Sequence, residues 1–192
     1  MTKKVEFFFD YVSLYSYLAN SQLAALDDLE VVYRPMLLGA VMQATGNRPP
    51  ASVPAKMKYL TTDSNRWARQ YGVPLVPNPI FPQNTLAVLR IATAALQRGD
   101  FAAVNQRIFD AAWVHKADLS DQQTVQALLV DAGLSVADYV DDIASEEIKA
   151  ALKATTDEAV ARGVFGAPTF FVGDEMFFGN DRMAMAAAAA RA

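Results

Sequence analysis

The sequence contains no cysteine. This absence excludes disulfide bonds, thiolate metal ligands and a cysteine nucleophile in this chain. Histidine is nearly absent as well, because His115 is the one histidine among the 192 residues. A metal site built from several histidines is therefore excluded, and a Ser-His-Asp triad would have to use His115. If the protein does thiol chemistry, the thiol must come from a bound molecule.

Long apolar runs and a strong excess of one charge are also absent. No segment approaches the ~18 uninterrupted apolar residues of a membrane-spanning helix. The formal net charge is −4 without a long basic run, which argues against nucleic acid or an anionic membrane as a partner. The first residues lead directly into a strand-like segment and lack the pattern of a secretory signal, so a cytoplasmic location is expected.

The residues that are present predict a well-packed α/β chain. Hydrophobic residues make up 53% and charged residues 20% of the sequence, which favours a large buried core. Strand-forming residues predict strands over residues 5–9 and 30–35, and apolar residues at helical spacing predict a helix over 15–26 between them. A helix that connects two strands favours a parallel pair.

The central part of the sequence is predicted to be helical. A proline-rich stretch at residues 72–82 is expected to be extended or turning. Apolar residues at helical spacing predict helices on either side of this stretch, over residues 54–71, 84–97, 100–113, 120–132, 135–143 and 145–162.

Strand character returns near the end of the sequence. Residues 169–172 and 175–178 flank Gly173-Asp174, which predicts a hairpin with a two-residue turn, and a last helix is expected over 182–190. The order of elements predicts a split α/β domain with a large all-helical insertion. We expect the α/β domain to comprise residues 1–37 and 163–192, and the insertion to comprise residues 38–162.

Ser13 stands at the junction between the first strand and the first helix. The first N–H groups of a helix have no partner within it, and the helix dipole places roughly half a positive charge there. An anion, including a thiolate, is stabilised in that position, and a serine hydroxyl can donate a hydrogen bond to it. The alternative interpretation is that Ser13 only caps the helix.

Two further segments have candidate binding residues. The Ala167-Pro168 bond directly precedes an apolar strand, and a cis peptide there would aim the Ala167 backbone outward to pair with an extended peptide. The alternative is a trans proline in an edge strand. Asn180 and Asp181 precede the last helix and can receive the amine or carboxylate of a ligand, although simple capping of the helix is the alternative.

Several segments together resemble one known family. They are FFFDYVSLYSYLA, GNRPPASVPAKMKYL, RWARQYGVP, GVFGAPTF and FGNDR, in this order along the chain. The sequence resembles the 2-hydroxychromene-2-carboxylate isomerases and the kappa-class glutathione transferases, which belong to the DsbA-like branch of the thioredoxin fold. The resemblance extends over essentially the whole chain, and it implies an α/β, thioredoxin-like (DsbA-like) fold with a helical insertion.

The resemblance also implies a binding site for glutathione as the cofactor. Ser13, at the position of the first redox cysteine of this fold, would contact the glutathione sulfur. Pro168 would be cis, and the Ala167 backbone would pair with the cysteinyl unit. The two ends of the tripeptide would be held by charged and amide side chains: Asn47 and Lys56 at the carboxylate end, and Asn180 and Asp181, with Arg182 adjacent, at the γ-glutamyl end.

The function implied is a glutathione-dependent isomerase of the 2-hydroxychromene-2-carboxylate type, which forms trans-o-hydroxybenzylidenepyruvate. A small aromatic-derived substrate is the expected partner, and a homodimer is possible by resemblance. One alternative is a kappa-like transferase that conjugates glutathione to an electrophile. An alternative from another class is a non-catalytic thioredoxin-fold binding module or chaperone.

The sequence departs from the family pattern directly after the key serine. Family members commonly have proline there, whereas this chain has Leu14, which is expected to alter the turn and the substrate pocket. Trp67 and Trp113 are expected as core aromatic residues, with a place in a pocket wall as the alternative. His115 is expected to be structural or at the surface, with a catalytic role as the alternative.

Overall fold

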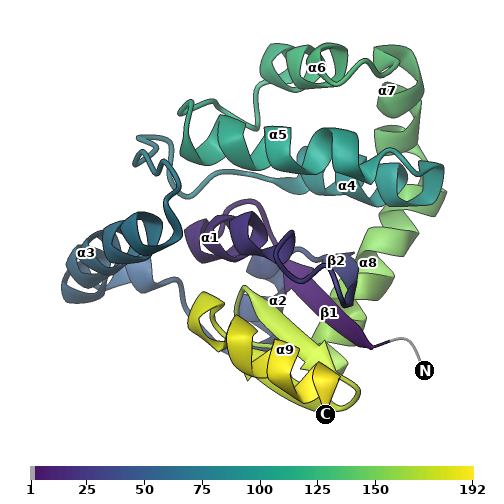
Figure 1. Ribbon diagram of the computed structural model, residues 1–192. Helices are drawn as coiled ribbons and strands as arrows, with labels where there is room; N and C mark the ends of the chain where they lie inside the picture. Colours follow the sequence, from purple (N-terminus) through teal and green to yellow (C-terminus); the bar gives the residue numbers. More distant parts are fainter. Residues whose placement is uncertain (1–2) are drawn as a thin grey trace.

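The computed structural model describes residues 3–192, and four strands in this part of the chain form one mixed sheet (Figure 1). The strands are β1 (Lys4–Phe9), β2 (Glu30–Pro35), β3 (Thr169–Val172) and β4 (Glu175–Phe178). Their order is β2-β1-β3-β4, with β1 and β2 parallel and the other two pairings antiparallel. The predicted parallel pair and the predicted hairpin are both confirmed.

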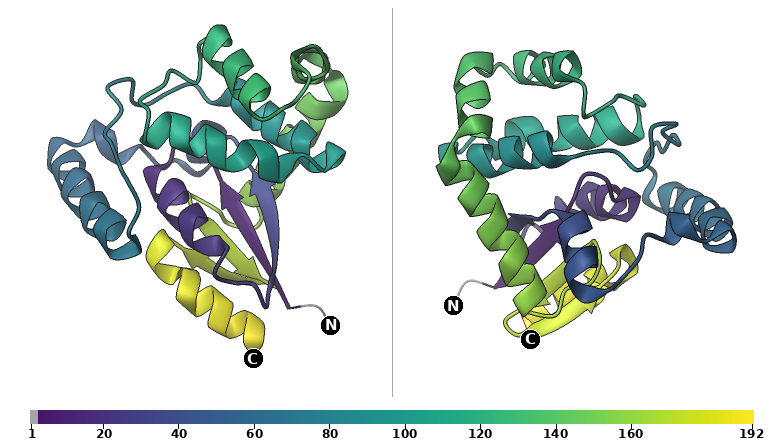
Figure 2. Two further views of the ribbon diagram at one scale, coloured as in Figure 1. Left: turned by 45° about the horizontal axis from the view of Figure 1, so that its top comes forward. Right: turned by 180° about the vertical axis from the view of Figure 1, so that it is seen from behind.

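The two faces of the sheet are covered by different helices, because side chains alternate along each strand. Phe7 and Phe170 pack with α1 (Leu14–Leu23) and α9 (Met183–Arg191) on one face. Phe8 and Phe171 pack with α2 (Leu38–Thr45) and α8 (Glu146–Ala161) on the other face. Figure 2 shows α2 and α8 in front of the sheet when the molecule is seen from behind. The sheet is therefore the middle layer between two helical layers.

The helices between α2 and α8 form a block beside the sheet. The segment begins with a short 3₁₀ turn, Pro50–Ser52, and continues with longer helices: α3 (Pro54–Tyr71), α4 (Leu86–Arg98), α5 (Phe101–Trp113), α6 (Gln122–Asp131) and α7 (Val136–Ala144). In Figure 1, α4 to α7 lie above the sheet and α3 stands to one side. In the described part of the chain, residues between β2 and β3 form only helices, turns and loops, as predicted.

One apolar core joins the sheet to this block. Buried residues of β1 and α1 contact buried residues of α4 and α5, including Val88 and Phe109. The rings of Phe7 and Phe9 stack at 5.0 Å, and those of Tyr11 and Phe109 lie 4.6 Å apart. Each fully buried side chain of this kind contributes roughly 1.5–3 kcal/mol to folding.

The predicted division of the chain into an α/β domain (residues 1–37 and 163–192) and a helical insertion (residues 38–162) stays a prediction.

Helix α2 is an element that sequence patterns did not predict. Its N-cap position, Leu37, makes no side-chain capping bond, so the usual local signal for a helix start is missing. The cap comes from another element, because Asp10 Oδ2 accepts a 2.9 Å hydrogen bond from the Leu38 N–H. The first helix is also shorter than predicted. It ends at Leu23, and isolated turns follow it to Leu26.

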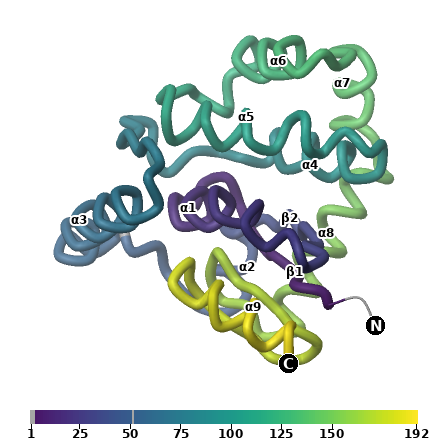
Figure 3. The backbone as a smooth tube through the Cα atoms, in the orientation of Figure 1, coloured from purple at the N-terminus to yellow at the C-terminus, as the bar shows by residue number. Residues whose placement is uncertain are grey.

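The proline-rich stretch between α3 and α4 forms no helix, as predicted, and it winds past the C-terminal end of α5 (Figure 3). The Val76 N–H donates to the Trp113 carbonyl at 2.8 Å, and Asn78 Nδ2 donates to the Ala112 carbonyl at 3.0 Å. These bonds attach the stretch to the last turn of α5. Leu75 and Phe81 of this stretch thereby lie with Trp113 beside α1, where they form an apolar wall.

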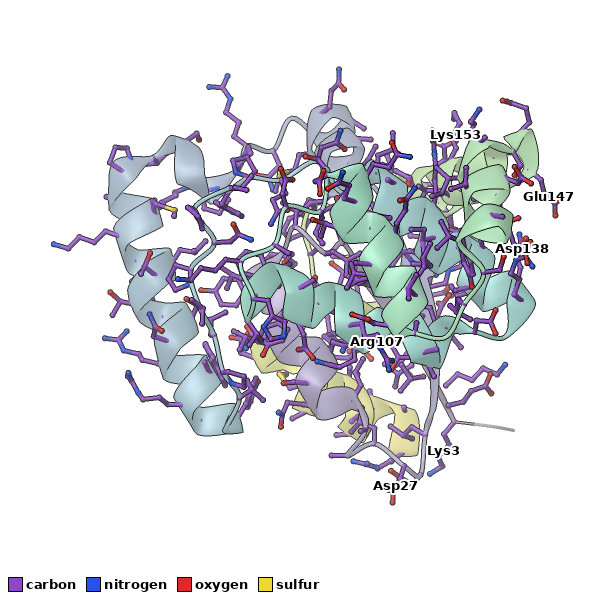
Figure 4. All side chains as sticks on the ribbon, turned by 90° about the horizontal axis from the view of Figure 1, so that it is seen from above. Lys3, Asp27, Arg107, Asp138, Glu147 and Lys153 are labelled. Carbon is purple, nitrogen blue, oxygen red and sulfur yellow. The ribbon has the colours of Figure 1, made fainter. Side chains whose placement is uncertain are left out.

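Most charged side chains lie on the outside of the molecule, and Asp10 is a buried exception. Figure 4 shows Asp138, Glu147 and Lys153 pointing outward from α7 and α8, and all three are exposed. Within residues 3–192, no helix is both long enough and apolar enough to span a bilayer.

Candidate active site

The candidate site begins at the turn between β1 and α1. The Ser13 N–H donates to the Asp10 carbonyl at 3.0 Å, which closes the turn. Ser13 is the N-cap of α1, and its Oγ accepts a 3.1 Å hydrogen bond from the Ser16 N–H. Only 9% of Ser13 is exposed. Ser13 therefore caps α1, and a role beyond capping stays a prediction at this point. The helix N-terminus gives the Ser13 hydroxyl a positive local field.

The Ser13 hydroxyl also contacts the segment before β3. Its Oγ donates a 3.0 Å hydrogen bond to the Ala167 carbonyl, although the two residues are 154 positions apart. The Ala167–Pro168 peptide bond is cis. The Pro168 carbonyl accepts from the Gly179 N–H at 3.0 Å, which connects this segment to the end of β4. The structure thus brings two of the predicted site segments into direct contact.

The backbone of Ala167 offers a donor at this point. Its N–H makes no hydrogen bond within residues 3–192, and the residue is partly exposed. Polar groups of the backbone that stay accessible next to a strand can pair with an added extended peptide. The Ala167 N–H can therefore donate a hydrogen bond to a ligand, while the Ala167 carbonyl accepts one from the Ser13 hydroxyl.

Asn47 lies next to the same segment. Its Nδ2 donates to the Phe165 carbonyl at 2.7 Å, and its Oδ1 accepts from the Arg48 N–H at 2.8 Å. Asn47 is exposed, and it fastens the loop after α2 to the chain two residues before Ala167. The side-chain amide is therefore occupied by backbone groups in this structure.

Lys56 lies in the first turn of α3, close to the start of α1. It lines a cavity of about 410 Å³ together with Tyr15, Tyr59 and Leu60, among others. The hydroxyls of Tyr15 and Tyr59 both donate to Asp63, at 2.9 and 3.2 Å. Burial, strengthened by the adjacent Asp63 carboxylate, raises the pKa of Tyr15 well above its ordinary value. Tyr15 is therefore a neutral hydrogen-bond donor that shapes the cavity.

The third predicted segment, around Asn180, packs beside α1 as a 3₁₀ turn (Asn180–Arg182). Asn180 is 4% exposed, and its Nδ2 donates to the Tyr71 hydroxyl at 3.3 Å. Asp181 and Arg182 are exposed and form an ion pair at 2.7 Å. The alternative of helix capping is wrong, since neither Asn180 nor Asp181 caps α9 with its side chain. These two side chains instead face Tyr71 and Arg182.

Ser13 and Ala167 are in direct contact, and the other predicted residues lie on elements near α1 or near the 165–168 segment. Asn47 is connected to the Ala167 segment by its hydrogen bond to the Phe165 carbonyl. Asn180 lies in the 3₁₀ turn that packs against α1, the helix that begins after Ser13. Among the described residues, no hydrogen bond joins Ser13 to Lys56 or to Arg182. The separated positions suit an extended ligand that reaches charged groups at both of its ends.

Sequence reasoning missed Asp10, whose carboxylate organises the turn. It is 1% exposed and accepts hydrogen bonds from the Val12 N–H, the Leu38 N–H and the Thr85 hydroxyl, at 3.0, 2.9 and 2.7 Å. Burial raises the pKa of Asp10, and the hydrogen bonds oppose that rise. The position of Asp10, a polar residue directly after a buried strand, was the one sequence feature that could have pointed to it. Its long-range partners, however, could not be inferred from the sequence.

A second cavity, of about 50 Å³, lies beside the first turn of α1 and shares Leu60 with the first cavity. Leu14, Leu75, Phe81 and Trp113 supply apolar walls, together with one face of α3. Trp113 is 4% exposed, so it is both a core aromatic and a wall residue. Leu14, which departs from the family pattern, faces this cavity. His115 is exposed and lines neither of the two cavities.

Within residues 3–192, no group of three or more histidine, cysteine, aspartate or glutamate side chains could hold a metal ion.

Comparisons with known proteins identify the family and the fold. The model of the DSBA-like thioredoxin domain matches residues 4–191. The 2-hydroxychromene-2-carboxylate isomerase of Sphingobium xenophagum is 32% identical, with 95% of each chain covered. Glutathione S-transferase kappa 1 of Rattus norvegicus is 30% identical over 95% of this chain and 88% of the relative.

A solved structure of a 2-hydroxychromene-2-carboxylate isomerase superposes with a TM-score of 0.88 at 30% identity, covering 97% of this chain and 93% of the other. The predicted thioredoxin-like (DsbA-like) fold and the predicted enzyme class are therefore confirmed. The chain belongs to the DSBA-like thioredoxin domain family, in the branch that contains the 2-hydroxychromene-2-carboxylate isomerases and the kappa glutathione transferases.

Proposed function

We propose that this protein is a glutathione-dependent isomerase of the 2-hydroxychromene-2-carboxylate type, which forms trans-o-hydroxybenzylidenepyruvate. The observation that carries the proposal is the placement of the Ser13 hydroxyl at the N-terminus of α1, 3.0 Å from the Ala167 carbonyl. The similarity to isomerases over nearly the whole chain supports the choice of reaction. A homodimer stays a prediction.

The residues present fit glutathione. The Ala167 N–H lacks a partner within residues 3–192, which suits pairing with the cysteinyl unit of a bound peptide. Lys56 on one side is proposed for the carboxylate end, together with Asn47, which would exchange its bond to Phe165 for the ligand. Asn180, Asp181 and Arg182 on the other side are proposed for the γ-glutamyl end.

Bound glutathione would supply a thiolate that adds reversibly to an unsaturated carbon of the substrate. The temporary loss of the double bond would permit ring opening and rotation, and expulsion of the thiolate would restore the double bond and return glutathione unchanged. Ser13 is proposed to turn its hydroxyl from the Ala167 carbonyl toward the sulfur and to stabilise the ionised form. A hydrogen bond to a charged group contributes about 1.5–3 kcal/mol, and a helix N-terminus about 0.3–1 kcal/mol. One pKa unit corresponds to about 1.4 kcal/mol, so the two effects suffice to bring a thiol from about 8.5 to near neutrality.

The substrate is proposed to enter beside Leu14. Apolar walls of Phe81 and Trp113 favour a flat, aromatic-derived molecule there, and the cavity of about 50 Å³ would have to widen to admit it. With substrate bound there, the apolar side chains would keep water away from the reacting atoms, and this would strengthen a hydrogen bond that Ser13 donates.

A kappa-like transferase is the second candidate, supported by the 30% identity to a kappa glutathione transferase. An assay with the chromene carboxylate and glutathione at one tenth of the substrate concentration separates the two. Turnover that continues well beyond one equivalent of glutathione is expected for the isomerase. Turnover that stops after one equivalent, with a conjugate formed, would establish the transferase. Binding of glutathione without any rate enhancement would favour a non-catalytic module.

A further inference from the structure

The turn that presents Ser13 is attached to α5 through Tyr11. Tyr11 lies two residues before Ser13 and is fully buried. Its carbonyl accepts a 2.9 Å hydrogen bond from the Trp113 indole N–H, and its hydroxyl donates to Asn105 Oδ1 at 3.0 Å. Trp113 and Asn105 both belong to α5, so one helix holds both the backbone and the side chain of Tyr11.

The indole ring of Trp113 has a second role in the same place. It lines the 50 Å³ cavity with Leu14, the residue that follows Ser13. The ring centroids of Phe81 and Trp113 are 5.9 Å apart, so the indole is packed from that side. Because close-packed side chains transmit small displacements, a molecule that presses on the indole ring also acts on the Tyr11 carbonyl.

We infer that Trp113 is a positioning residue, whose indole N–H fixes the Ser13 turn while its ring forms the wall of the substrate cavity. The chemical consequence of this inference rests on the proposed function, whereas the attachment of the turn does not. Without the indole N–H, the Tyr11 carbonyl would be a buried acceptor without a donor. The turn would shift to find another partner, and a displacement of about 1 Å at a reacting group can lower a rate about 100-fold.

The test compares the wild-type protein with Trp113→Phe and Tyr139→Phe. Trp113→Phe removes the indole N–H and keeps an aromatic wall. Tyr139→Phe is the matched control, because Tyr139 is a buried aromatic residue of α7 whose hydroxyl donates to Asp100 at 3.2 Å. Both substitutions remove one donor from a buried aromatic side chain, but only the first one touches the turn.

The first measurement is amide hydrogen exchange of the ligand-free proteins, followed by mass spectrometry on the peptide that contains residues 10–14. We expect at least tenfold faster exchange in this peptide for Trp113→Phe and unchanged exchange for Tyr139→Phe. Equal exchange in all three proteins would overturn the inference. This measurement needs no glutathione, so its outcome is independent of the proposed function.

The second measurement is the ultraviolet absorbance of bound glutathione thiolate as a function of pH. The pH midpoint of thiolate formation is expected to rise by about one unit in Trp113→Phe, which is a tenfold loss of thiolate below the midpoint. In Tyr139→Phe the midpoint is expected to equal that of the wild type. An unchanged midpoint in Trp113→Phe would contradict the positioning role. A wild-type protein without a thiolate signal would refute the proposed function, while the exchange experiment would still decide whether Trp113 holds the turn.

A more conservative replacement covers the case in which Trp113→Phe does not fold. Site-specific incorporation of benzothienylalanine at position 113 keeps the bicyclic shape and replaces the indole N–H by sulfur. The same two measurements apply, with the same expected and contradicting results. Tenfold faster exchange of the turn in this protein would support the inference without any loss of packing.

Discussion

Two turns lie beside α1, and they are held in different ways. The Asp10–Ser13 turn is buried, and its hydrogen-bond partners come from α2, the start of α4 and α5. The 180–182 turn has the exposed pair Asp181 and Arg182, which are neighbours in the sequence. Its one buried side chain, Asn180, reaches the Tyr71 hydroxyl through a long 3.3 Å bond.

The difference shows which part of the proposed site is rigid. Hydrogen bonds between buried groups are strong because the surroundings have a low dielectric constant, and losing a partner there is costly. Exposed ion pairs contribute about 0.2–1 kcal/mol and adjust easily. We therefore expect the end of the site that faces the sulfur to tolerate little change, and the end that faces the γ-glutamyl group to tolerate more.

The largest expected effect follows removal of the Asp10 carboxylate. Asp10→Ala leaves the Leu38 N–H, the Val12 N–H and the Thr85 hydroxyl without their acceptor. We expect a loss of about 3 kcal/mol or more in the free energy of unfolding, measured by urea denaturation. The matched control is Thr93→Val, which removes a buried hydroxyl that bonds only within α4. A loss for Asp10→Ala no larger than that for Thr93→Val would contradict the idea of a rigid turn.

Asp10 also gives the stability a defined dependence on pH. Since burial raises its pKa in the folded protein above 3.8, the folded state binds the proton more tightly than the unfolded state. The corresponding stabilisation is fully present below about pH 3.8 and is lost as the pH rises through the folded pKa. The stability of the wild type minus that of Asp10→Asn is therefore expected to fall across this window and then stay level. A difference that rises with pH would show that the hydrogen bonds outweigh burial.

Ser13→Ala is expected to have the next largest effect, mainly on turnover. If the hydroxyl stabilises a thiolate, kcat falls about 10- to 150-fold, since a hydrogen bond to a charged group contributes about 1.5–3 kcal/mol. The lost cap costs about 1 kcal/mol of stability. Ser135→Ala is the control, because Ser135 caps α7 in the same way, by accepting from the Asp138 N–H. It should lose similar stability and keep full activity; equal activity of the two variants would argue against a role for Ser13 in catalysis.

Gly179→Ala tests whether a change at the exposed 180–182 turn leaves the Asp10–Ser13 turn unaffected. Gly179 has φ +105°, and an added Cβ would lie 2.5 Å from Asp181 Oδ1. We expect the strain to cost about 1–3 kcal/mol of stability. KM for glutathione should rise several-fold, because Asp181 must move, while the midpoint of thiolate formation stays unchanged.

Gly133→Ala is the control for this substitution. Gly133 also has a positive φ, +73°, but an added Cβ there meets nothing within 4 Å. Backbone strain without displacement of Asp181 should leave KM unaltered. A shift of the thiolate midpoint in Gly179→Ala would show that the two turns are not independent.

The smallest effect is expected for Asp181→Asn, which breaks the exposed pair with Arg182. Stability should change by less than about 1 kcal/mol, because surface ion pairs contribute little. Asp157→Asn, which breaks the exposed pair with Lys153 on α8, is the matched control. If Asp181 holds the γ-glutamyl amine, only Asp181→Asn raises KM for glutathione; identical kinetics of both variants would remove Asp181 from the proposed site.

Much of the fold was predictable, because local patterns specify it. Runs of strand-forming residues predicted all four strands, and the Gly173-Asp174 turn predicted the hairpin. Helix α2 was not predictable, because its cap is a carboxylate from a distant segment. Of the groups in the proposed site, Ser13 and the 167–168 segment were predicted from the sequence, whereas Asp10 and the contact of Trp113 with Tyr11 were not.

The sequence by itself determined that any thiol chemistry must use a borrowed sulfur, since it has no cysteine. It also determined which short segments adopt strands, helices and turns, because those preferences act between near neighbours. Only the tertiary structure decided that the Ser13 hydroxyl meets the Ala167 carbonyl and that α5 holds the turn before it. Such contacts join residues about a hundred or more positions apart, and they form because buried polar groups must find partners wherever the packed core places them.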